Sequence, residues 1–282
     1  MRERKPREKD LWGYLEHLQE SERAPATVRK YERAIRSFFA WASANGTGIA
    51  KGIVIRYKEY LLERRAASGV NGELAALNGF FTHMEWHECR VRPVRVQRRG
   101  YSDPEKELSR EEYLRLVNAA KRRKNERLAL LLQAMCSTGV RVSEVQYLTV
   151  EALGRSRMEV HNKGKSRTVL LPGALCEKLR LYCEKRGIRE GSVFVTRTGR
   201  PLNRSNIWLM MKALCGAARV DERKVFPHNL RHLFALCFYQ AQKYLEHLAT
   251  ILFHSIINTT RIYTQTSGAE HRRQLEQLHL LT

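Results

Sequence analysis

The stretch RVRPVRVQRRG, residues 90–100, is the feature that most constrains how this chain can fold. Its proline and closing glycine interrupt regular structure, and its alternation of arginine and valine favours extended backbone. The chain has 282 residues, which is enough for two domains at about 150 residues each. We therefore place a domain boundary within residues 90–107.

Positive charge lies on both sides of this boundary. Residues 1–100 hold 20 Lys and Arg against 12 Asp and Glu, the remainder holds 31 against 17, and the formal net charge is +22. Such an excess indicates a polyanionic partner, with nucleic acid favoured over an anionic membrane surface. Both domains are expected to face this partner. For the arginine stretch itself, the alternative is a solvated linker with spare charge.

Other features of the composition narrow the class of protein. No stretch approaches the roughly 20 apolar residues of a spanning helix, and the start, MRERKPREKD, lacks the apolar region of a signal peptide. Six cysteines are scattered without a C-x-x-C pair. We expect a cytosolic protein with reduced thiols, no metal site and no membrane contact.

The first part of the chain is predicted to be helical. In ATVRKYERAIRSFFAWA, residues 26–42, apolar side chains recur at helical spacing, and Thr27 is the expected N-cap. Arg29, Arg33 and Arg36 share a different face of this helix, where they either contact DNA or are solvated. Further short helices are expected at residues 52–62 and 73–86.

The second part of the chain mixes helices with a hairpin. Ser109 and Glu112 form a capping-box pattern, and ERLALLLQAM at residues 126–135 is apolar nearly all round, which predicts a central helix. SRMEVHN and SRTVLLP flank a turn at residues 163–165 and predict a β-hairpin. From Pro227 onward the pattern is again helical.

Five short segments hold the residues suited to chemistry: TGVRVSE, NKGKSR, PHNLRH, LFHS and NTTRIYT. Arg141 follows a glycine turn and opens a helix. His228 and Arg231, three residues apart on a helix that begins at Pro227, project from one face. Each segment alone is unspecific. Together they combine arginines, lysines, histidines and a tyrosine in one basic domain.

In this order and spacing the segments resemble the tyrosine recombinase (phage integrase, Xer-type) family, over nearly the whole chain. The resemblance implies a mainly α fold with a small antiparallel β-sheet, arranged as two domains that clamp DNA. These are a helical core-binding (SAM-like) domain at residues 1–98, a basic linker at 99–107 and an α+β catalytic domain at 108–282. The arginines expected at the DNA are Arg29, Arg33, Arg36, Arg95, Arg98 and Arg99.

The resemblance also implies how DNA would be cut. Arg141 and Arg231 would hold the non-bridging oxygens of the scissile phosphate, since guanidinium groups match phosphate geometry. Tyr263 would attack the phosphorus, form a 3′-phosphotyrosine link and release a 5′-hydroxyl. Glu144 resembles the acidic residue that orients this site.

Proton transfer is assigned by the same resemblance. Lys163 would protonate the departing oxygen, with Lys165 as the alternative, because the hairpin is one residue shorter than the common family form. His228 would assist proton transfer from the tyrosine, and His254 would hydrogen-bond the phosphate. Phe253 stands where the family usually has glycine. The covalent link conserves bond energy, so no ATP, nucleotide cofactor or metal is expected.

The sequence thus predicts a site-specific recombinase that cleaves and rejoins duplex DNA, for integration or excision of a mobile element or a related rearrangement. A catalytically silent, sequence-specific DNA-binding protein and a type IB topoisomerase are the alternatives. The C-terminal segment at residues 267–281 is expected to form a helix, which contacts a neighbouring subunit or packs on its own domain. Partners are double-stranded DNA and further copies of the chain: a tetramer on two DNA sites, a monomer or weak dimer when free. The expected location is the cytoplasm, at the nucleoid.

Overall fold

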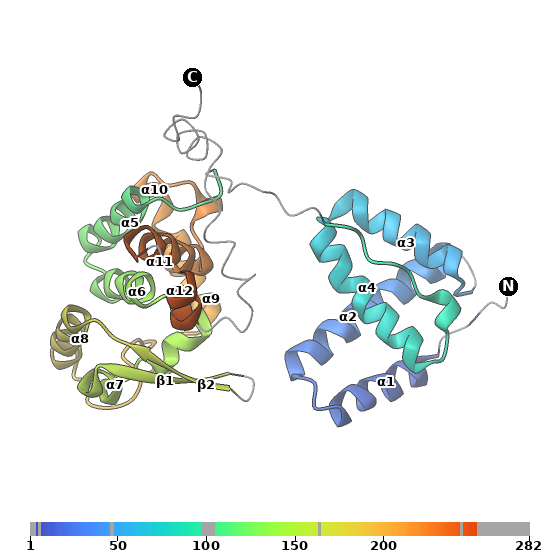
Figure 1. Ribbon diagram of the computed structural model, residues 1–282, viewed down its shortest axis with the longest axis horizontal. Helices are drawn as coiled ribbons and strands as arrows, with labels where there is room; N and C mark the ends of the chain where they lie inside the picture. Colours follow the sequence, from blue (N-terminus) through green and yellow to red (C-terminus); the bar gives the residue numbers. More distant parts are fainter. Residues whose placement is uncertain are drawn as a thin grey trace, which may run out of the picture. The chain divides into compact units, whose positions relative to one another are not determined.

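The chain folds into two compact units, Met1–Arg98 and Arg99–Thr282 (Figure 1). The computed structural model describes residues 4, 7–45, 48–96, 105–162, 165–242 and 245–252. Helices dominate both units, and the described residues form one sheet, a two-stranded antiparallel hairpin. The predicted mainly α fold with a small antiparallel sheet is therefore confirmed. In the described part of the chain, no helix has both the length and the apolarity needed to cross a membrane.

Four helices build the first unit around its own apolar core. The long helix α2 packs along α4, and α1 and α3 contact both of them. Aromatic rings fill much of the space between, with Phe38 against Tyr57 and Phe81. The elements are α1 (Glu8–Glu20), α2 (Pro25–Asn45), α3 (Lys51–Arg64), α4 (Ala67–His83) and the 3-10 turn η1 (His87–Cys89).

Helix α2 begins earlier than the sequence pattern predicts. It starts at Pro25, and the backbone N–H groups of Thr27 and Val28 both donate to the carbonyl of Ala24. Thr27 therefore lies inside the first turn, and its prediction as the N-cap is wrong. Proline suits the first helical position, because its fixed φ fits a helix and its missing N–H would have no partner there.

The arginine-rich stretch is anchored to the first unit over the part that the structure describes. Two asparagines on α4 each bond both backbone groups of one valine in this stretch: Asn78 pairs with Val91 at 2.8 and 3.0 Å, and Asn71 with Val94 at 2.9 and 2.7 Å. Val91 is buried, whereas the arginines of residues 90–96 are exposed. The predicted extended backbone is present, and the anchoring makes this stretch display its arginines to solvent.

The second unit surrounds one central helix. Helix α6 contacts α5, α8 and α11, while α7 contacts both strand β1 and α8 (Figure 1). The helices are α5 (Arg110–Arg122), α6 (Glu126–Thr138), α7 (Val150–Arg155), α8 (Gly173–Arg186), α9 (Arg204–Lys212), α10 (Cys215–Ala218), α11 (Pro227–Gln242) and α12 (Leu245–Leu252). The remaining elements are β1 (Arg157–Asn162), β2 (Lys165–Leu170) and the 3-10 helices η2 (Val142–Tyr147) and η3 (Glu222–Lys224).

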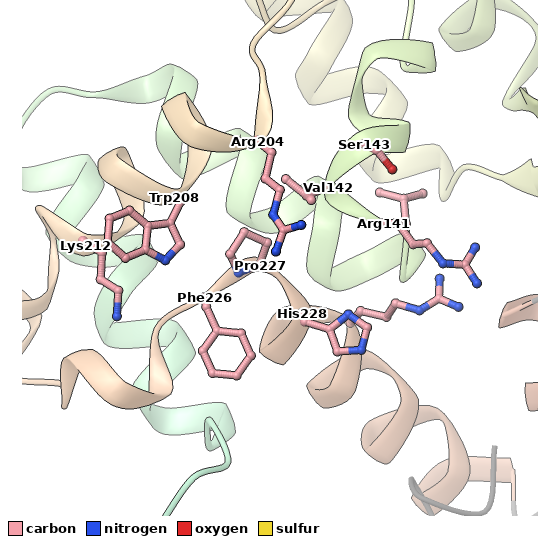
Figure 2. A pocket seen from close by; sticks show the side chains of 11 residues that line it. Arg141, Val142, Ser143, Arg204, Trp208, Lys212, Phe226, Pro227 and His228 are labelled. Carbon is pink, nitrogen blue, oxygen red and sulfur yellow. The ribbon is translucent and has the colours of Figure 1, made fainter. Parts of the chain in front are cut away.

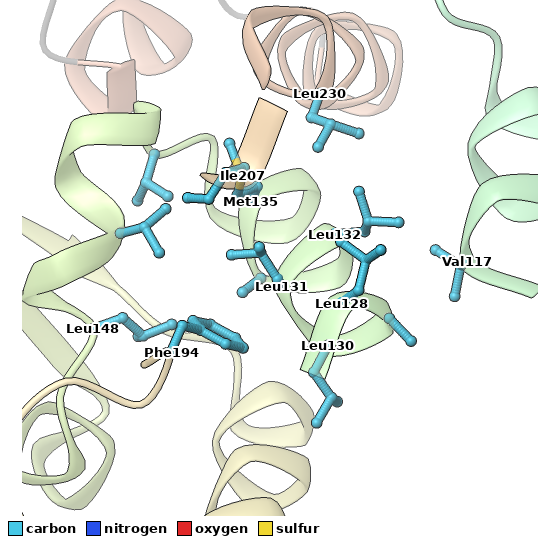
Figure 3. Packing of buried hydrophobic residues seen from close by; sticks show 14 of the residues in the cluster. Val117, Leu128, Leu130, Leu131, Leu132, Met135, Leu148, Phe194, Ile207 and Leu230 are labelled. Carbon is cyan, nitrogen blue, oxygen red and sulfur yellow. The ribbon is translucent and has the colours of Figure 1, made fainter. Parts of the chain in front are cut away.

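The predictions for α5 and α6 hold in detail. The Ser109 hydroxyl accepts from the Glu112 backbone N–H at 3.2 Å, and the Glu112 carboxylate accepts from the Ser109 N–H at 2.8 Å, which completes the capping box. Leucines leave α6 in several directions toward Val117 on α5 and Leu230 on α11 (Figure 3). A helix that is apolar on all sides has to be buried by other elements, and α5, α8 and α11 pack around α6 in this way.

The hairpin places one charged residue on its inner face. Val160 on β1 pairs with Arg167 on β2, and Met158 pairs with Val169. All four side chains are buried, while the intervening residues face solvent. Because strand side chains alternate between two faces, Arg167 has to lie on the same face as Val169, inside the unit.

Gly139 ends α6 with a left-handed backbone, φ +65°, that favours glycine. A Cβ at this position would lie 2.5 Å from Cδ1 of Phe234, whereas Gly187, with φ +67°, has open space around it. Gly139→Ala should therefore destabilise the fold by about 1 to 3 kcal/mol more than Gly187→Ala, since the two changes share the backbone cost but differ in crowding. Urea denaturation of the full chain followed by circular dichroism measures the difference. Equal losses would contradict this packing.

Candidate active site

A cavity of about 480 Å³ opens where η2, α9 and α11 come together. Figure 2 shows Arg141 on one side of it, Trp208 and Lys212 on the other, and Pro227 and His228 at the start of α11 between them. Most of its polar lining is basic or aromatic. The full lining is Val140, Arg141, Val142, Ser143, Arg204, Trp208, Lys212, Phe226, Pro227, His228 and Arg231.

Arg141 reaches this cavity because of the turn that precedes it. Gly139 closes α6, and Arg141 then caps the N-terminus of η2 with extended backbone. This short 3-10 helix brings Glu144 back beneath Arg141. The Arg141 side chain remains 34% exposed, so part of its guanidinium group faces the cavity.

Glu144 is buried and fixes Arg141 at two points. Its Oε2 accepts from the Arg141 backbone N–H at 2.7 Å, and its Oε1 accepts from Arg141 Nη1 at 2.9 Å. Oε2 also pairs with Nη2 of Arg167. Burial alone would raise the pKa of Glu144, but the Arg141 N–H, the charge of Arg167 and the bonds from both guanidinium groups outweigh it and lower the pKa. Glu144 is therefore ionised at neutral pH.

Arg231 on α11 is buried and is held by backbone carbonyls. Its Nη1 donates to the carbonyl of Gly139, and its Nη2 donates to the carbonyl of Leu252 at 2.8 Å. Arg141 and Arg231 thus differ in access, because Arg141 is half-buried and Arg231 is 1% exposed. Arg231 adds a fixed positive charge to the cavity wall from within the fold.

His228 lies one residue after Pro227 at the start of α11 and is exposed at the cavity. Its pKa is lowered by partial desolvation, and then by the positive groups of Arg231, His232, Arg141 and Arg204. A lowered pKa keeps the imidazole neutral at pH 7, where it can accept a proton or a hydrogen bond.

The described groups carry an excess of positive charge suited to an anion. The carboxylate of Glu144 pairs with two guanidinium groups, those of Arg141 and Arg167. The guanidinium group of Arg231 adds a third positive charge and donates to backbone carbonyls instead. Buried positive charge of this kind is stabilised when an anion completes the site, and guanidinium groups hold phosphate by paired hydrogen bonds. The arrangement is able to bind a phosphodiester and to stabilise additional negative charge on it.

Four of the predicted site residues meet here: Arg141, Glu144, His228 and Arg231. Three other predicted catalytic residues lie outside the described residues: Lys163, His254 and Tyr263. Phe253 lies outside them as well. The choice between Lys163 and Lys165 stays a prediction.

The arginines predicted to contact DNA differ in their surroundings. Arg29, Arg33 and Arg95 are exposed, and Arg98 and Arg99 lie outside the described residues. Arg36 is paired with carboxylates of its own unit.

Arg36 bonds Glu8 and Glu32, each at 3.0 Å, and its guanidinium lies 5.5 Å from the ring centre of Trp12. These contacts hold α1 against α2. Arg36 therefore has a structural role that the sequence pattern did not reveal.

Sequence reasoning missed two groups of residues at the site. Arg167 is recognisable only from the alternation of β2, which places it on the inner face opposite Val160. Arg204, Trp208 and Lys212 follow each other at every fourth position of α9, so a helical face with this composition was the available signal.

A mainly helical fold with an arginine-lined cavity fits a tyrosine recombinase, an enzyme class that cuts and rejoins DNA strands. The chain belongs to the phage integrase family: the family model matches residues 106–270, and the model of the phage integrase N-terminal SAM-like domain matches residues 11–88. The predicted family is therefore confirmed.

Individual relatives agree with this assignment. Tyrosine recombinase XerA of Thermococcus kodakarensis is 29% identical over 266 residues, 90% of this chain and 89% of that protein. The structure of a lambda integrase tetramer bound to a Holliday junction aligns with a TM-score of 0.73 at 16% identity, over 91% of this chain and 76% of that one. The Tn1549 transposon integrase in complex with transposon right end DNA aligns with a TM-score of 0.71 at 14% identity, over 95% and 99%.

The charges around His228 can be tested by titration. In the free protein, NMR should give His228 a pKa below its usual value, and Arg204→Gln should raise it because one nearby positive charge is removed. Arg200→Gln, an exposed change outside the cavity, is the matched control and should leave the pKa unchanged. A bound phosphodiester should also raise the pKa, because negative charge favours the imidazolium. If Arg204→Gln leaves the pKa where it was, these electrostatics are wrong.

Proposed function

We propose that this protein is a site-specific tyrosine recombinase that cleaves and rejoins duplex DNA through a 3′-phosphotyrosine intermediate. The observation that carries the proposal is Arg141, which is fixed by buried Glu144 and faces an open cavity beside neutral His228. Integration or excision of a mobile element, or a related rearrangement, is the biological context we propose.

The reaction would divide among the residues as follows. Arg141 and Arg231 supply positive charge that stabilises the pentacoordinate phosphorane. The Tyr263 oxygen forms a bond to phosphorus as the bond to the 5′ oxygen breaks. His228 takes up the tyrosine proton, and Lys163 delivers a proton to the departing oxygen. Attack by a 5′-hydroxyl on the phosphotyrosine reverses these steps and rejoins the strand without an external energy source.

Two basic surfaces would guide the DNA. Arg29 and Arg33 lie exposed on α2. The anchored stretch at residues 90–96 also displays its arginines, because the backbone groups of Val91 and Val94 are bonded to asparagines of α4. Phosphate contacts of this kind set the position of the duplex without reading its sequence. In the second unit, Arg204 lies on the cavity wall beside the site and would hold the backbone next to the cleaved phosphate.

The proposed assembly is a tetramer on two DNA sites, formed by a chain that is a monomer or weak dimer when free. The segment at residues 267–281 would supply the contact between subunits. We place the protein in the cytoplasm, at the nucleoid, where its DNA substrate is found.

The two neighbouring arginines of α2 give a matched test of the DNA surface. Arg33→Gln should weaken binding to duplex DNA by about 3- to 10-fold in low salt and reduce the salt slope by about one, because one phosphate contact is lost. Arg36→Gln should change affinity less, since Arg36 is already paired with Glu8 and Glu32, and should lower thermal stability instead. Gel-shift titrations and thermal melts measure both. A larger loss of affinity from Arg36→Gln would contradict this assignment.

The chemistry is tested with nicked suicide duplexes that cover the DNA flanking the gene, incubated in EDTA and run on denaturing gels. Wild type should form a covalent protein–DNA adduct, because the released fragment diffuses away and rejoining is blocked. Tyr263→Phe should bind the same duplexes in a native gel shift and form no adduct, since it lacks the attacking oxygen.

The other outcomes are equally informative. An adduct with Tyr263→Phe would exclude Tyr263 as the only nucleophile. Specific binding by wild type without any adduct would replace the proposal with the catalytically silent DNA-binding protein. Relaxation of supercoils without exchange between two duplexes would indicate a topoisomerase.

A further inference from the structure

Arg167 is the one arginine that faces inward from the hairpin, and it makes contacts from both ends of its guanidinium group. Its side chain is 5% exposed. Nη2 pairs with Oε2 of Glu144, and Nη1 donates to the carbonyl of Ile251 at 3.1 Å. Arg167 therefore joins three elements that lie far apart in the sequence: β2, η2 and the last turn of α12.

These contacts close into a ring. Arg141 bonds Glu144, Glu144 bonds Arg167, and Arg167 bonds Ile251. The next residue, Leu252, bonds Arg231, and Arg231 returns to Gly139, two residues before Arg141. A closed ring of charged hydrogen bonds restricts each member more than an isolated pair does.

The ring also fixes the end of a short helix. The last carbonyls of a helix have no partners within it and form the negative end of its dipole. In α12, two consecutive carbonyls, of Ile251 and Leu252, accept from the buried guanidinium groups of Arg167 and Arg231. The sequence continues from this fixed end into Phe253 and His254.

The stability of the fold alone does not explain why an arginine is buried at position 167. Its buried Nε has no hydrogen-bond partner among the described residues, which carries a desolvation cost. A buried ion pair is also often no more stabilising than apolar side chains of the same volume. The planar fork of arginine does supply what the position needs, two separate donors for a carboxylate and a carbonyl.

We propose that Arg167 is a positioning residue of the reaction, and this rests on the proposed function. It holds Glu144 in the orientation that fixes Arg141, and it holds the end of α12 at a set distance from that arginine. Arg167 does not contact the DNA. Its effect on the rate passes through Arg141 and the end of α12.

The test compares Arg167→Gln and Arg167→Lys with wild type on the suicide duplex. Both variants should bind DNA within about 3-fold of wild type, because Arg167 is buried. Single-turnover cleavage by Arg167→Gln should be about 100-fold slower, the size of effect that a small misplacement of a catalytic group produces. Arg167→Lys should recover only part of the rate, since one ammonium group cannot replace both ends of the fork.

A control variant and a double-mutant cycle distinguish a positioning role of Arg167 from an effect on the stability of the fold alone. Arg127→Gln removes another half-buried arginine that donates to a backbone carbonyl, that of Val195, away from the site. It should lower thermal stability and leave the cleavage rate unchanged. Arg167→Gln combined with Glu144→Gln should be no slower than the slower single variant, because the two residues act as one unit.

Hydrogen exchange without DNA gives a readout that does not need the reaction. Arg167→Gln should speed exchange in peptides from η2 and α12 and leave α8 unchanged, whereas Arg127→Gln should leave η2 and α12 as in wild type. Unchanged exchange there, a wild-type cleavage rate in folded Arg167→Gln, or independent effects in the cycle would each overturn the proposal. If wild type itself forms no adduct, the proposed function fails, and exchange still decides whether Arg167 organises these elements.

Discussion

The arrangement of the cavity in the second unit depends on the interactions of one carboxylate, that of Glu144. It is buried, ionised and shared by Arg141 and Arg167, with the Arg141 backbone N–H as a further donor. A charge taken out of water at this depth is tolerated only when its lone pairs are bonded, and each of its donors is thereby fixed in place. Glu144 thus converts the flexible side chain of Arg141 into a rigid ligand at the cavity.

The negative charge of Glu144 does not balance the positive charges around the cavity. Glu144 pairs with the guanidinium groups of Arg141 and Arg167, while that of Arg231 donates to backbone carbonyls. His228 stays neutral because desolvation and the neighbouring cations disfavour its protonation. The free protein therefore holds positive charge in a partly buried place that a phosphodiester can occupy. The bonds from Arg231 to the carbonyls of Gly139 and Leu252 hold its positive charge in place. In the proposed reaction, charge that is fixed in advance in this way would stabilise the transition state.

Much of this could be predicted from the sequence, because the informative patterns are local. Neighbours along the chain determine the capping box at Ser109 and the apolar helix α6. Short motifs in the sequence likewise contain the arginines, the glutamate and the histidine of the cavity. Arg167 and the anchored stretch beside α4 could not be predicted in the same way, since their partners lie many residues away. The sequence pattern grouped Arg36 with the arginines expected at the DNA, because it lies on a basic helix face. In the structure it is paired with two carboxylates of its own unit.

In the proposed reaction this positive charge surrounds a phosphate that Tyr263 attacks, so the most direct measurement identifies the residue joined to DNA. The adduct from a suicide duplex is digested with nuclease and trypsin and sequenced by tandem mass spectrometry. We expect a nucleotide remnant on Tyr263, within the peptide IYTQTSGAEHR at residues 262–272. A remnant on any other residue would contradict it.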